Sequence, residues 1–323
     1  MGAFTIEDIL SIDGQEEFDR VALELFAWQA ECCPPYREYL SLLDVKPAKV
    51  NHPARIPFLP IELFKSHRIY CCTDEPQIVF TSSSTGGSGL SRHYVARKSD
   101  YEKTFRRAFE LFYGSPADIG IYALLPGYLE REGSSLIYMV DDLIRQGSRG
   151  GFYLNDYNRL LNDMEADSGA KILFGVSYAL LDLAERYRPV LRDTIVMETG
   201  GMKGRREEIA KQEFHSILCE AFGVDAIHSE YGMAELSSQA YSSGANVFQP
   251  PGWVRAIARD LNNPFDMLRP GRAGGLNIID LANIDSCAFI QTQDIGTVYD
   301  DGAFSVFGRA DRSEIRGCNL LVQ

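Results

Sequence analysis

A run of nine consecutive Ser, Thr or Gly residues, from Thr81 to Gly89, is the feature of this sequence most suited to chemistry. It comes directly after the apolar residues Ile78–Phe80, which predict a strand. Glycines let neighbouring backbone amides point the same way and hydroxyls add donors, so such a run can wrap an anionic phosphate. A flexible surface loop has the same composition, but the place at the carboxyl end of a strand favours a binding site. The candidate phosphate ligands are Thr81, Ser82, Ser83, Ser84, Thr85, Gly86 and Gly87.

Three familiar motifs do not fit this run. A Walker A loop needs Gly-Lys-Ser/Thr after its second glycine, whereas Leu90 follows Gly89. The dinucleotide fingerprint G-x-G-x-x-G fails because Arg92 stands three residues after Gly89. The nucleophile elbow G-x-S-x-G fails because Ser88 is followed by Gly89 and Leu90. These mismatches disfavour a P-loop NTPase, a dinucleotide enzyme and an α/β-hydrolase.

Four further short motifs follow the run in order: Glu198–Gly201 (ETGG), Tyr231–Glu235 (YGMAE), Gln293–Gly296 (QDIG) and Gly308–Asp311 (GRAD). Together with the run they resemble the motif set of the acyl-adenylate-forming superfamily, which includes acyl-CoA synthetases, luciferases and the adenylation domains of peptide synthetases. The resemblance covers residues 81–311. It implies an enzyme that activates a carboxylic acid with ATP and Mg²⁺.

The resemblance also implies roles for single residues. Tyr231 corresponds to the aromatic residue near adenine and Glu235 to the glutamate that holds Mg²⁺, while Ala234 replaces the usual threonine and removes one hydroxyl that would contact phosphate. Asp294 corresponds to the aspartate that binds the ribose hydroxyls, and Arg309 to the arginine near ribose and phosphate. The full set of implied nucleotide ligands outside the Ser/Thr/Gly run is Gly200, Gly201, Tyr231, Gly232, Met233, Asp294 and Arg309.

The physical chemistry of the reaction agrees with this set. When a carboxylate attacks the α-phosphate of ATP, anions approach one another, so the site needs a metal ion, amide donors and cationic side chains. A glutamate oxygen such as that of Glu235 is a suitable Mg²⁺ ligand. Ordinary structural explanations stay open: Glu235 as a solvated turn carboxylate, Asp294 as a turn cap beside Gly296, and Arg309 as a surface ion-pair residue.

The end of the sequence departs from the superfamily pattern. There the last motif is followed by a C-terminal lid domain of roughly a hundred residues that supplies a catalytic lysine, whereas twelve residues follow Asp311. We therefore expect either that the lid is absent or that the sequence is truncated. If the lid is absent, another cation must act: Lys203 is the first candidate, and Arg92, Arg205 and Arg206 are the others.

If the lid domain is absent, the resemblance narrows from the superfamily to one family within it. Phe58–Lys65, Glu198–Gly204 and the terminal Arg316–Cys318 resemble the acyl-protein synthetases, or luciferin-component ligases, of the bacterial fatty-acid reductase system. The similarity extends from about Ile56 to Leu320. It implies that a fatty acid is activated, held as a thioester on Cys318, and passed to an acyl-CoA-reductase-like partner protein.

Three functional readings stay open at this point. The first is an acid–thiol ligase that uses Cys318 as its own acceptor. The second is an acyl- or aryl-CoA ligase with coenzyme A as the thiol, and the third is a catalytically silent nucleotide-binding or scaffold subunit. The sequence identifies neither the acid and its chain length nor the oligomeric state.

Composition excludes several other classes. The 323 residues carry 45 acids against 32 bases, a formal charge of −13, which disfavours binding of nucleic acid over a broad surface. No apolar stretch approaches the roughly 18 residues of a membrane span, and the N-terminus lacks a signal-peptide pattern, so we expect a soluble cytoplasmic protein. The seven cysteines form no C-x-x-C pair, which argues against a structural metal site and for reduced thiols.

The elements that must position these residues follow from hydrophobic periodicity. Residues 16–30 predict an amphipathic helix. Residues 78–222 alternate apolar runs, such as Lys171–Val176, with helical patterns, such as Glu207–Phe222, which is typical of βαβ units around a mostly parallel sheet. After Gly244 only short strands are predicted, among them Phe289–Thr292 and Thr297–Tyr299, as in a small antiparallel or barrel-like region. The predicted fold is therefore α/β and similar to the N-terminal domain of the adenylate-forming enzymes. We expect an N-terminal helical segment (1–75), an α/β core (76–245) and a small β region (246–323).

Overall fold

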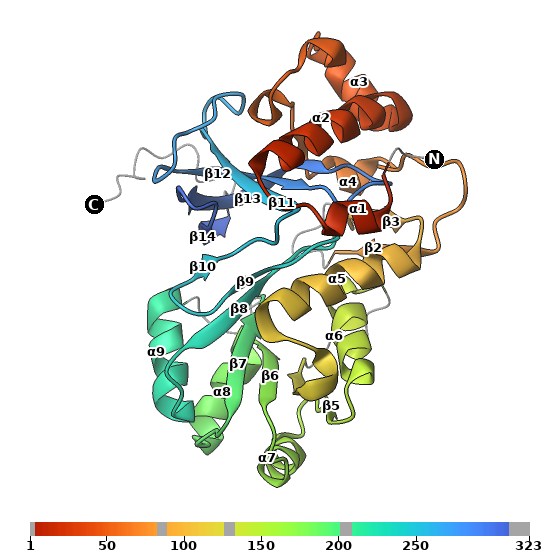
Figure 1. Ribbon diagram of the computed structural model, residues 1–323. Helices are drawn as coiled ribbons and strands as arrows, with labels where there is room; N and C mark the ends of the chain where they lie inside the picture. The colour runs from red at the N-terminus through yellow and green to blue at the C-terminus, as the bar shows by residue number, and fades with distance from the viewer. Residues whose placement is uncertain (1–3, 83–88, 126–132, 201–208, 310–323) are drawn as a thin grey trace. The chain divides into compact units, whose positions relative to one another are not determined.

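The computed structural model describes residues 4–82, 89–125, 133–200 and 209–309 and divides into two compact units (Figure 1). Unit 2 is the single stretch Pro76–Pro251. Unit 1 combines Met1–Glu75 with Gly252–Gln323, so the two ends of the chain contribute to one unit.

Unit 2 is built on a six-stranded sheet in the order β5-β4-β6-β7-β8-β9. All neighbouring pairs are parallel except β8 and β9, which are antiparallel. The strands are β4 Gly120–Leu124, β5 Gly150–Phe152, β6 Lys171–Val176, β7 Thr194–Thr199, β8 Ile227–Tyr231 and β9 Ala240–Ser242, and the short β10 Val247–Phe248 follows. The expected α/β fold with a mostly parallel sheet is confirmed.

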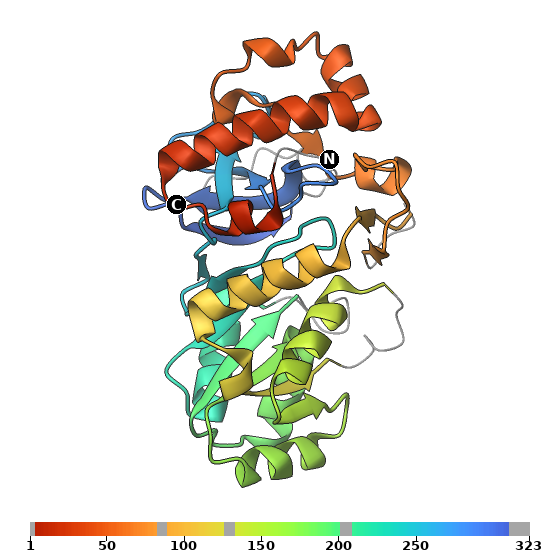
Figure 2. The ribbon, with the colours of Figure 1, turned by 45° about the vertical axis from the view of Figure 1, so that its right-hand side comes forward.

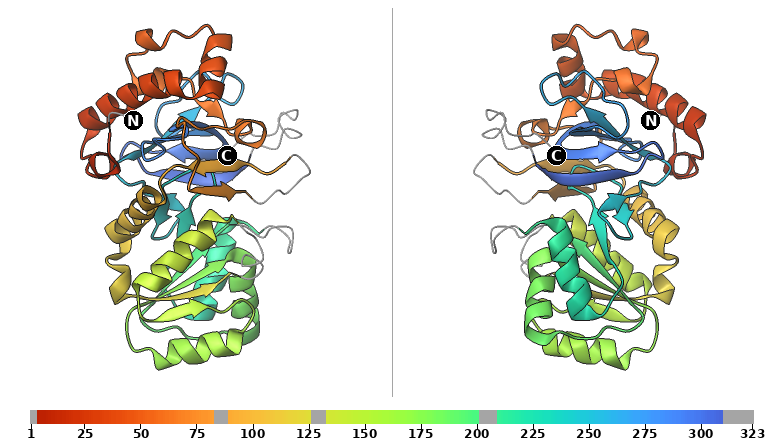
Figure 3. Two further views of the ribbon diagram at one scale, coloured as in Figure 1. Left: turned by 90° about the vertical axis from the view of Figure 1, so that its right-hand side faces the viewer. Right: turned by 90° about the vertical axis from the view of Figure 1, so that its left-hand side faces the viewer.

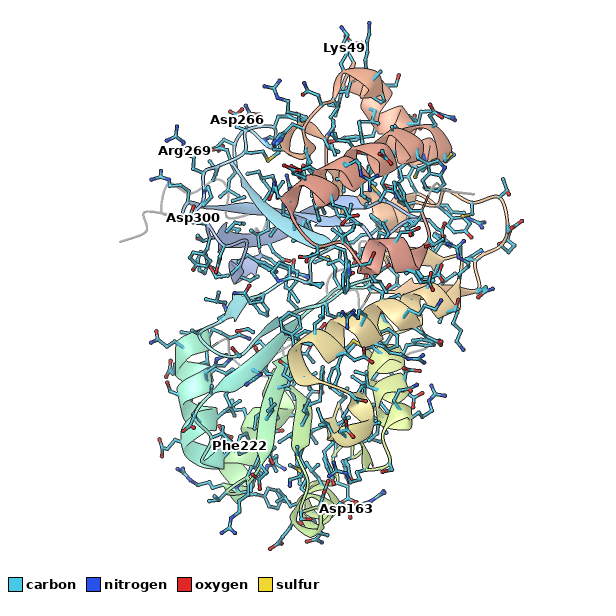
Figure 4. All side chains as sticks on the ribbon, viewed as in Figure 1. Lys49, Asp163, Phe222, Asp266, Arg269 and Asp300 are labelled. Carbon is cyan, nitrogen blue, oxygen red and sulfur yellow. The ribbon has the colours of Figure 1, made fainter. Side chains whose placement is uncertain are left out.

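Helices cover both faces of this sheet. In Figure 3, α8 and α9 lie on one face, and α5 and α6 lie on the other. Because both faces are covered, every residue of β4 and of β6 is buried. The helices are α5 Lys98–Tyr113, α6 Ser135–Gln146, α7 Tyr157–Ala166, α8 Ser177–Tyr187 and α9 Lys211–Phe222, with a 3₁₀ turn at Pro116–Asp118. Phe222, at the end of α9, is fully buried (Figure 4).

The strand before the Ser/Thr/Gly run does not join the parallel sheet. β2 (Ile78–Thr81) pairs antiparallel with β3 (Arg92–Val95) in a separate two-stranded sheet. The described start of the run, Thr81 and Ser82, therefore belongs to this two-stranded sheet and its end and not to the carboxyl edge of the parallel sheet. A local apolar run predicts a strand but not its partner, and this is why periodicity missed the pairing.

Unit 1 packs N-terminal helices on a C-terminal antiparallel sheet. The helices are α1 Ile6–Leu10, α2 Gln15–Cys32, α3 Pro34–Leu42 and α4 Leu63–Ser66, with 3₁₀ turns at Pro47–Lys49 and Pro53–Arg55. The strands are β1 Leu59–Pro60, β11 Val254–Arg259, β12 Ala273–Asp280, β13 Phe289–Val298 and β14 Phe304–Arg309. Strands β11 to β14 pair antiparallel in sequence order, and β1 adds to β13 in parallel. Charged side chains such as Lys49, Asp266, Arg269 and Asp300 lie on the outside of this unit (Figure 4).

Helix α2 follows the predicted amphipathic pattern and lies against the sheet of unit 1 (Figure 2). Its Phe26 ring packs edge-on against Phe289 of β13, with ring centroids 5.9 Å apart. The buried Gln29 side chain donates to the carbonyl oxygens of Asn283 and Ile284 and accepts from the Ala288 amide. The Gln29 side-chain amide therefore links helix α2 to the segment that precedes β13. No helix in the described part of the chain is long and apolar enough to cross a membrane.

Candidate functional site

The start of the Ser/Thr/Gly run is anchored in unit 2. The Thr81 amide donates to the carbonyl oxygen of Gly133 at 2.8 Å. Gly133 has a φ of +84°, and a Cβ there would lie 2.9 Å from Thr81 Oγ1, so glycine permits this close approach. The Ser82 amide donates to the Ser91 carbonyl at 3.2 Å, and the Ser91 amide donates to Ser82 Oγ at 3.1 Å. The other candidate phosphate ligands lie outside the described residues: Ser83, Ser84, Thr85, Gly86 and Gly87.

The Tyr231–Glu235 segment begins at the end of β8. Tyr231 is the last residue of the strand, and its ring centroid lies 5.6 Å from that of Phe248 in β10. The chain then turns, and the Leu236 amide donates to the Met233 carbonyl at 3.2 Å. Glu235 lies within this turn but is only 5% exposed, so it is not the solvated turn carboxylate that the sequence also allowed.

His93 of β3 connects the hairpin to this segment. Its Nδ1 lies 2.9 Å from the carbonyl oxygen of Ala234. Because a carbonyl oxygen only accepts, Nδ1 carries the proton and donates. Burial lowers the pKa of His93 to about 4, so the imidazole is neutral near pH 7. The backbone beside Glu235 is thereby held by a buried contact that does not titrate in the physiological range.

A buried carboxylate, Glu198, closes the end of β7. Ser177 Oγ donates to its Oε2 at 3.0 Å, Ser229 Oγ donates to its Oε1 at 2.8 Å, and Lys211 forms an ion pair with Oε1. His215 Nε2 lies 3.5 Å from the same oxygen. Burial alone would raise the pKa of Glu198, but His215, Lys211 and Ser229 together lower it to about 2. Glu198 is therefore a fixed anion that joins α8, α9, β7 and β8.

The glycine-containing motif after β7 is described only in part. Gly200 has a φ of +68°, and its carbonyl oxygen accepts from Ser177 Oγ at 3.1 Å. Gly201 and the candidate cation Lys203 lie outside the described residues, as do Arg205 and Arg206. Among the candidate cations, Arg92 is described, and it lies exposed at the start of β3.

Glu230, directly before Tyr231, was missed by the sequence reasoning. Burial raises its pKa to about 7; the hydrogen bond from Thr199 opposes this rise and the charge of Glu198 adds to it. Thr199 Oγ1 donates to Glu230 Oε2 at 2.5 Å, and a Cβ on Gly232 would lie 2.3 Å from Oε1. The pKa of Glu198 is thus lowered to about 2, whereas that of the neighbouring Glu230 is raised to about 7. Shifted pKa values of this kind are common at functional sites. The only signal in the sequence was that Glu230 adjoins the motif.

In unit 1 the structure brings Asp294 and Arg309 together. They are register partners in β13 and β14, and Arg309 Nε donates to Asp294 Oδ1 at 3.1 Å. Asp294 is 5% exposed, whereas the Arg309 side chain is 69% exposed. The register of the two strands shifts next to Gly296, where a Cβ would lie 1.9 Å from the Ser305 carbonyl oxygen. Glycine is therefore required for the local ladder that positions the Asp294–Arg309 pair.

A buried arginine, Arg259, forms a hydrogen bond to β13, the strand that carries Asp294. Arg259 Nη2 donates to the Thr292 carbonyl at 2.7 Å, and its Nη1 donates to the Leu276 carbonyl at 2.7 Å and to Asn277 Oδ1 at 3.0 Å. Thr292 Oγ1 in turn accepts from the Asp294 amide at 3.1 Å. Burial lowers the pKa of Arg259 to about 10, which leaves it charged near pH 7. Arg259 thus belongs to the network that fixes the backbone of Asp294.

The described residues contain no group of three or more His, Cys, Asp or Glu side chains that could hold a metal ion by themselves. Magnesium at nucleotide sites typically takes one or two protein carboxylates together with substrate phosphates, so such a site needs no cluster of three protein ligands. Cys318, the candidate acyl acceptor, lies outside the described residues.

Comparison with known proteins gives one relative of defined activity. No family model matches the chain. The chain is 26% identical over 139 residues to the long-chain-fatty-acid–luciferin-component ligase of Vibrio harveyi. The match covers 40% of this chain and 36% of that ligase.

Solved structures define the fold. An ATP-bound MatB from Rhodopseudomonas palustris matches with a TM-score of 0.55 and 17% identity, over 72% of this chain and 47% of that chain. A 2-hydroxyisobutyryl-CoA ligase in complex with 2-HIB-AMP and CoA matches with a TM-score of 0.69 and 14% identity, over 92% and 75% of the respective chains. The chain has the fold of these ligases, and the resemblance inferred from the motifs is confirmed at that level.

Proposed function

We propose that this protein activates a carboxylic acid with ATP, forming an acyl-adenylate and pyrophosphate, and passes the acyl group to a thiol. The observation that carries the proposal is the Tyr231–Glu235 segment, which puts a buried carboxylate, Glu235, in the turn after strand β8 of a fold similar to that of an ATP-bound ligase. The order of the other motifs supports the same reading.

In the first step a carboxylate oxygen of the acid attacks the α-phosphorus of ATP, and pyrophosphate leaves with the electrons of the broken P–O bond. Backbone amides at the Ser/Thr/Gly run and the cation of Lys203 are assigned to the phosphates, where they stabilise negative charge. Tyr231 and the glycines of residues 200–201 are assigned to adenine. Asp294 is assigned to the ribose hydroxyls and Arg309 to ribose and phosphate.

Magnesium fits the chemistry of Glu235. A buried carboxylate is a hard oxygen ligand, and an ATP-bound Mg²⁺ draws its remaining ligands from phosphate and water. When bound, the ion neutralises phosphate charge. The His93–Ala234 hydrogen bond holds the backbone next to Glu235, so this chain orients the carboxylate before ATP arrives.

In the second step a thiolate attacks the acyl carbon, a thioester forms and AMP leaves. We assign Cys318 as the acceptor and a fatty acid as the substrate class on the motif resemblance, with an acyl-CoA-reductase-like protein as the partner that receives the acyl group. Coenzyme A is the second candidate acceptor, because the similar 2-hydroxyisobutyryl-CoA ligase was solved in complex with CoA.

Pyrophosphate release tests the first step. The protein is mixed with ATP, Mg²⁺ and a panel of carboxylic acids, and we expect release that depends on the acid. Glu235→Gln should lower the rate by about a hundredfold or more, because a charge stabiliser is lost. Glu220→Gln is the matched control, since Glu220 forms a surface ion pair with Arg188. Binding of ATP without pyrophosphate release from any acid would favour the scaffold reading and refute the proposal.

Acid-stable label on the protein tests the second step. With ATP, Mg²⁺ and a radiolabelled acid, Cys318 should carry a label that neutral hydroxylamine removes, because hydroxylamine cleaves thioesters. Cys318→Ser should abolish the label while pyrophosphate release continues. Label that persists in this variant would move the acceptor to another cysteine, and turnover that requires coenzyme A without protein label would identify the second candidate acceptor.

A further inference from the structure

Two buried polar atoms beside the Tyr231–Glu235 segment have no hydrogen-bond partner among the described residues. They are Gln239 Oε1 and the Tyr241 hydroxyl, on side chains of residues that are 6% and 1% exposed. A buried polar atom that loses water and gains no partner destabilises the folded state, so native proteins keep such atoms for a reason. Gln239 and Tyr241 lie just before and within β9, next to the strand that carries the segment.

The side chains that carry these two atoms lie near Glu230. Glu230 and Tyr241 are register partners across β8 and β9, so their side chains share one face of the sheet. A Cβ on Gly232 would lie 2.3 Å from Glu230 Oε1 and 3.5 Å from Gln239 Cγ, so both side chains lie against this glycine. Burial and the nearby charge of Glu230 both raise the pKa of Tyr241. We call Glu230, Gln239 and Tyr241 the β8–β9 polar cluster.

The hydrogen-bonding groups of this cluster are complementary to one kind of ligand. Thr199 Oγ1 donates to Glu230 Oε2. The cluster presents one buried acceptor without a partner, Gln239 Oε1, and one buried donor without a partner among the described residues, the Tyr241 hydroxyl. A ligand hydroxyl can donate to an acceptor and accept from the tyrosine at the same time. A hydrocarbon chain would leave Gln239 Oε1 and the Tyr241 hydroxyl unpaired.

Aromatic side chains surround the cluster, and the hydroxyl group of one of them has a hydrogen-bond partner within the protein. The rings of Phe112 and Tyr113 in α5 lie 5.2 Å from the Tyr241 ring, so the cluster is covered by apolar groups. The Tyr113 hydroxyl lies 3.2 Å from His228 Nδ1 and is hydrogen-bonded to it. The Tyr113 hydroxyl therefore has a protein partner, whereas that of Tyr241, whose ring packs edge-on against Tyr113, has none among the described residues.

We propose that the β8–β9 polar cluster binds a hydroxyl group of the acid that this protein activates, so that its substrates are hydroxy acids. This inference rests on the proposed function and narrows its substrate class. The cluster directly flanks Tyr231–Glu235, the segment assigned to ATP and Mg²⁺, and the carboxylate of the acid must reach the α-phosphate held there. The amino group of adenine shares the donor chemistry, so the test must separate the acid from the nucleotide.

The test compares acids of equal chain length with and without a hydroxyl group at carbon 2, carbon 3 or the terminal carbon. In pyrophosphate release, the best hydroxy acid should exceed its unsubstituted counterpart in kcat/KM by on the order of tenfold or more. Gln239→Leu and Tyr241→Phe should each reduce this preference severalfold, through the KM for the acid and with an unchanged KM for ATP. Tyr113→Phe is the matched control and should keep the preference, because its hydroxyl already has a protein partner.

Two results would overturn the proposal: equal or better use of the unsubstituted acids, or a raised KM for ATP in the two variants. Thermal unfolding is a second measurement that does not need turnover. Without ligand, Tyr241→Phe should unfold at a higher temperature than the wild type, because an unpaired hydroxyl is removed. Hydroxy acids should raise the unfolding temperature of the wild type but not of Tyr241→Phe. If no acid supports pyrophosphate release, the proposed function fails. The unfolding temperature with hydroxy acids, compared with that in unsubstituted acids, still decides whether the cluster binds a hydroxyl group.

Discussion

Replacing Glu230 with glutamine is expected to stabilise unit 2 above pH 7. Burial raises the pKa of Glu230 from its usual 4.5 to about 7, so between these values the folded protein holds a proton that the unfolded chain has lost. For a carboxyl group with a raised pKa, stability falls as pH rises through this window. Glutamine is neutral at every pH and can still accept the hydrogen bond from Thr199.

The magnitude follows from the two pKa values. A tenfold change in proton affinity corresponds to about 1.4 kcal/mol, so charging Glu230 costs about 3 kcal/mol above pH 7 and about 2 kcal/mol near pH 6. Below about pH 4.5 both states are protonated and the difference disappears. The Glu230 side chain keeps some exposure to solvent, which screens the charge and makes these figures upper values.

Urea unfolding followed by far-UV circular dichroism measures the effect. Trp28 and Trp253, the two tryptophans of the chain, both belong to unit 1, so their fluorescence does not report on unit 2. The gain of Glu230→Gln over the wild type should be small near about pH 5 and largest near about pH 8. Glu220→Gln, at an exposed ion pair, should show no such trend. An equal gain at both pH values, or a more stable wild type near about pH 8, would refute the reasoning.

Two further predictions concern Glu198 in unit 2 and Gly296 in unit 1. Glu198→Gln should destabilise unit 2 by about 2–4 kcal/mol near pH 7, because hydrogen bonds and an ion pair to a charged group are lost. Since the pKa of Glu198 is lowered to about 2, the wild type should lose this stability as pH falls from 4.5 through about 2. If Glu198→Gln kept the same acid sensitivity, Glu198 would not be the group responsible. Gly296→Ala should lower the stability of unit 1 by about 2 kcal/mol or more, because a Cβ would lie 1.9 Å from the Ser305 carbonyl oxygen. Tryptophan fluorescence in urea measures this loss, and ATP affinity should fall with it if Asp294 and Arg309 bind the ribose.

Local patterns predicted most of the elements but not their partners. The apolar run of β6 was predicted at Lys171–Val176, as observed, and α2 differs from its prediction only at its ends. Strand β13 was predicted as two strands, because Gln293–Gly296 has the composition of a turn. In the structure a shift of register at Gly296 lets the chain stay in the ladder, which is a property of the pair β13–β14 and not of either sequence. Helix α9 begins at Lys211 and not near Glu207 as predicted, which is the usual error at helix ends.

The candidate site was predictable where family motifs name its residues and unpredictable where pairing creates it. Glu235 and the Asp294–Arg309 pair were singled out by motif, although their roles stay predictions. The β8–β9 polar cluster has no motif, because Glu230 and Tyr241 meet only when β9 reverses against β8. Glu198 was quoted as part of a glycine-containing loop, yet its buried contacts to Ser177 and Ser229 depend on two other elements.

The discontinuity of unit 1 has a consequence for the synthesis of the protein. The ribosome releases α2 early, but the strand against which Phe26 packs, β13, emerges only after the whole of unit 2 has been translated. At ordinary elongation rates this delay is on the order of ten seconds or more. During that time unit 2 is a continuous stretch that can complete its own sheet, while the apolar face of α2 stays uncovered on the nascent chain. We therefore expect mutations that make this face of α2 more apolar to reduce the yield of folded protein without changing its final stability.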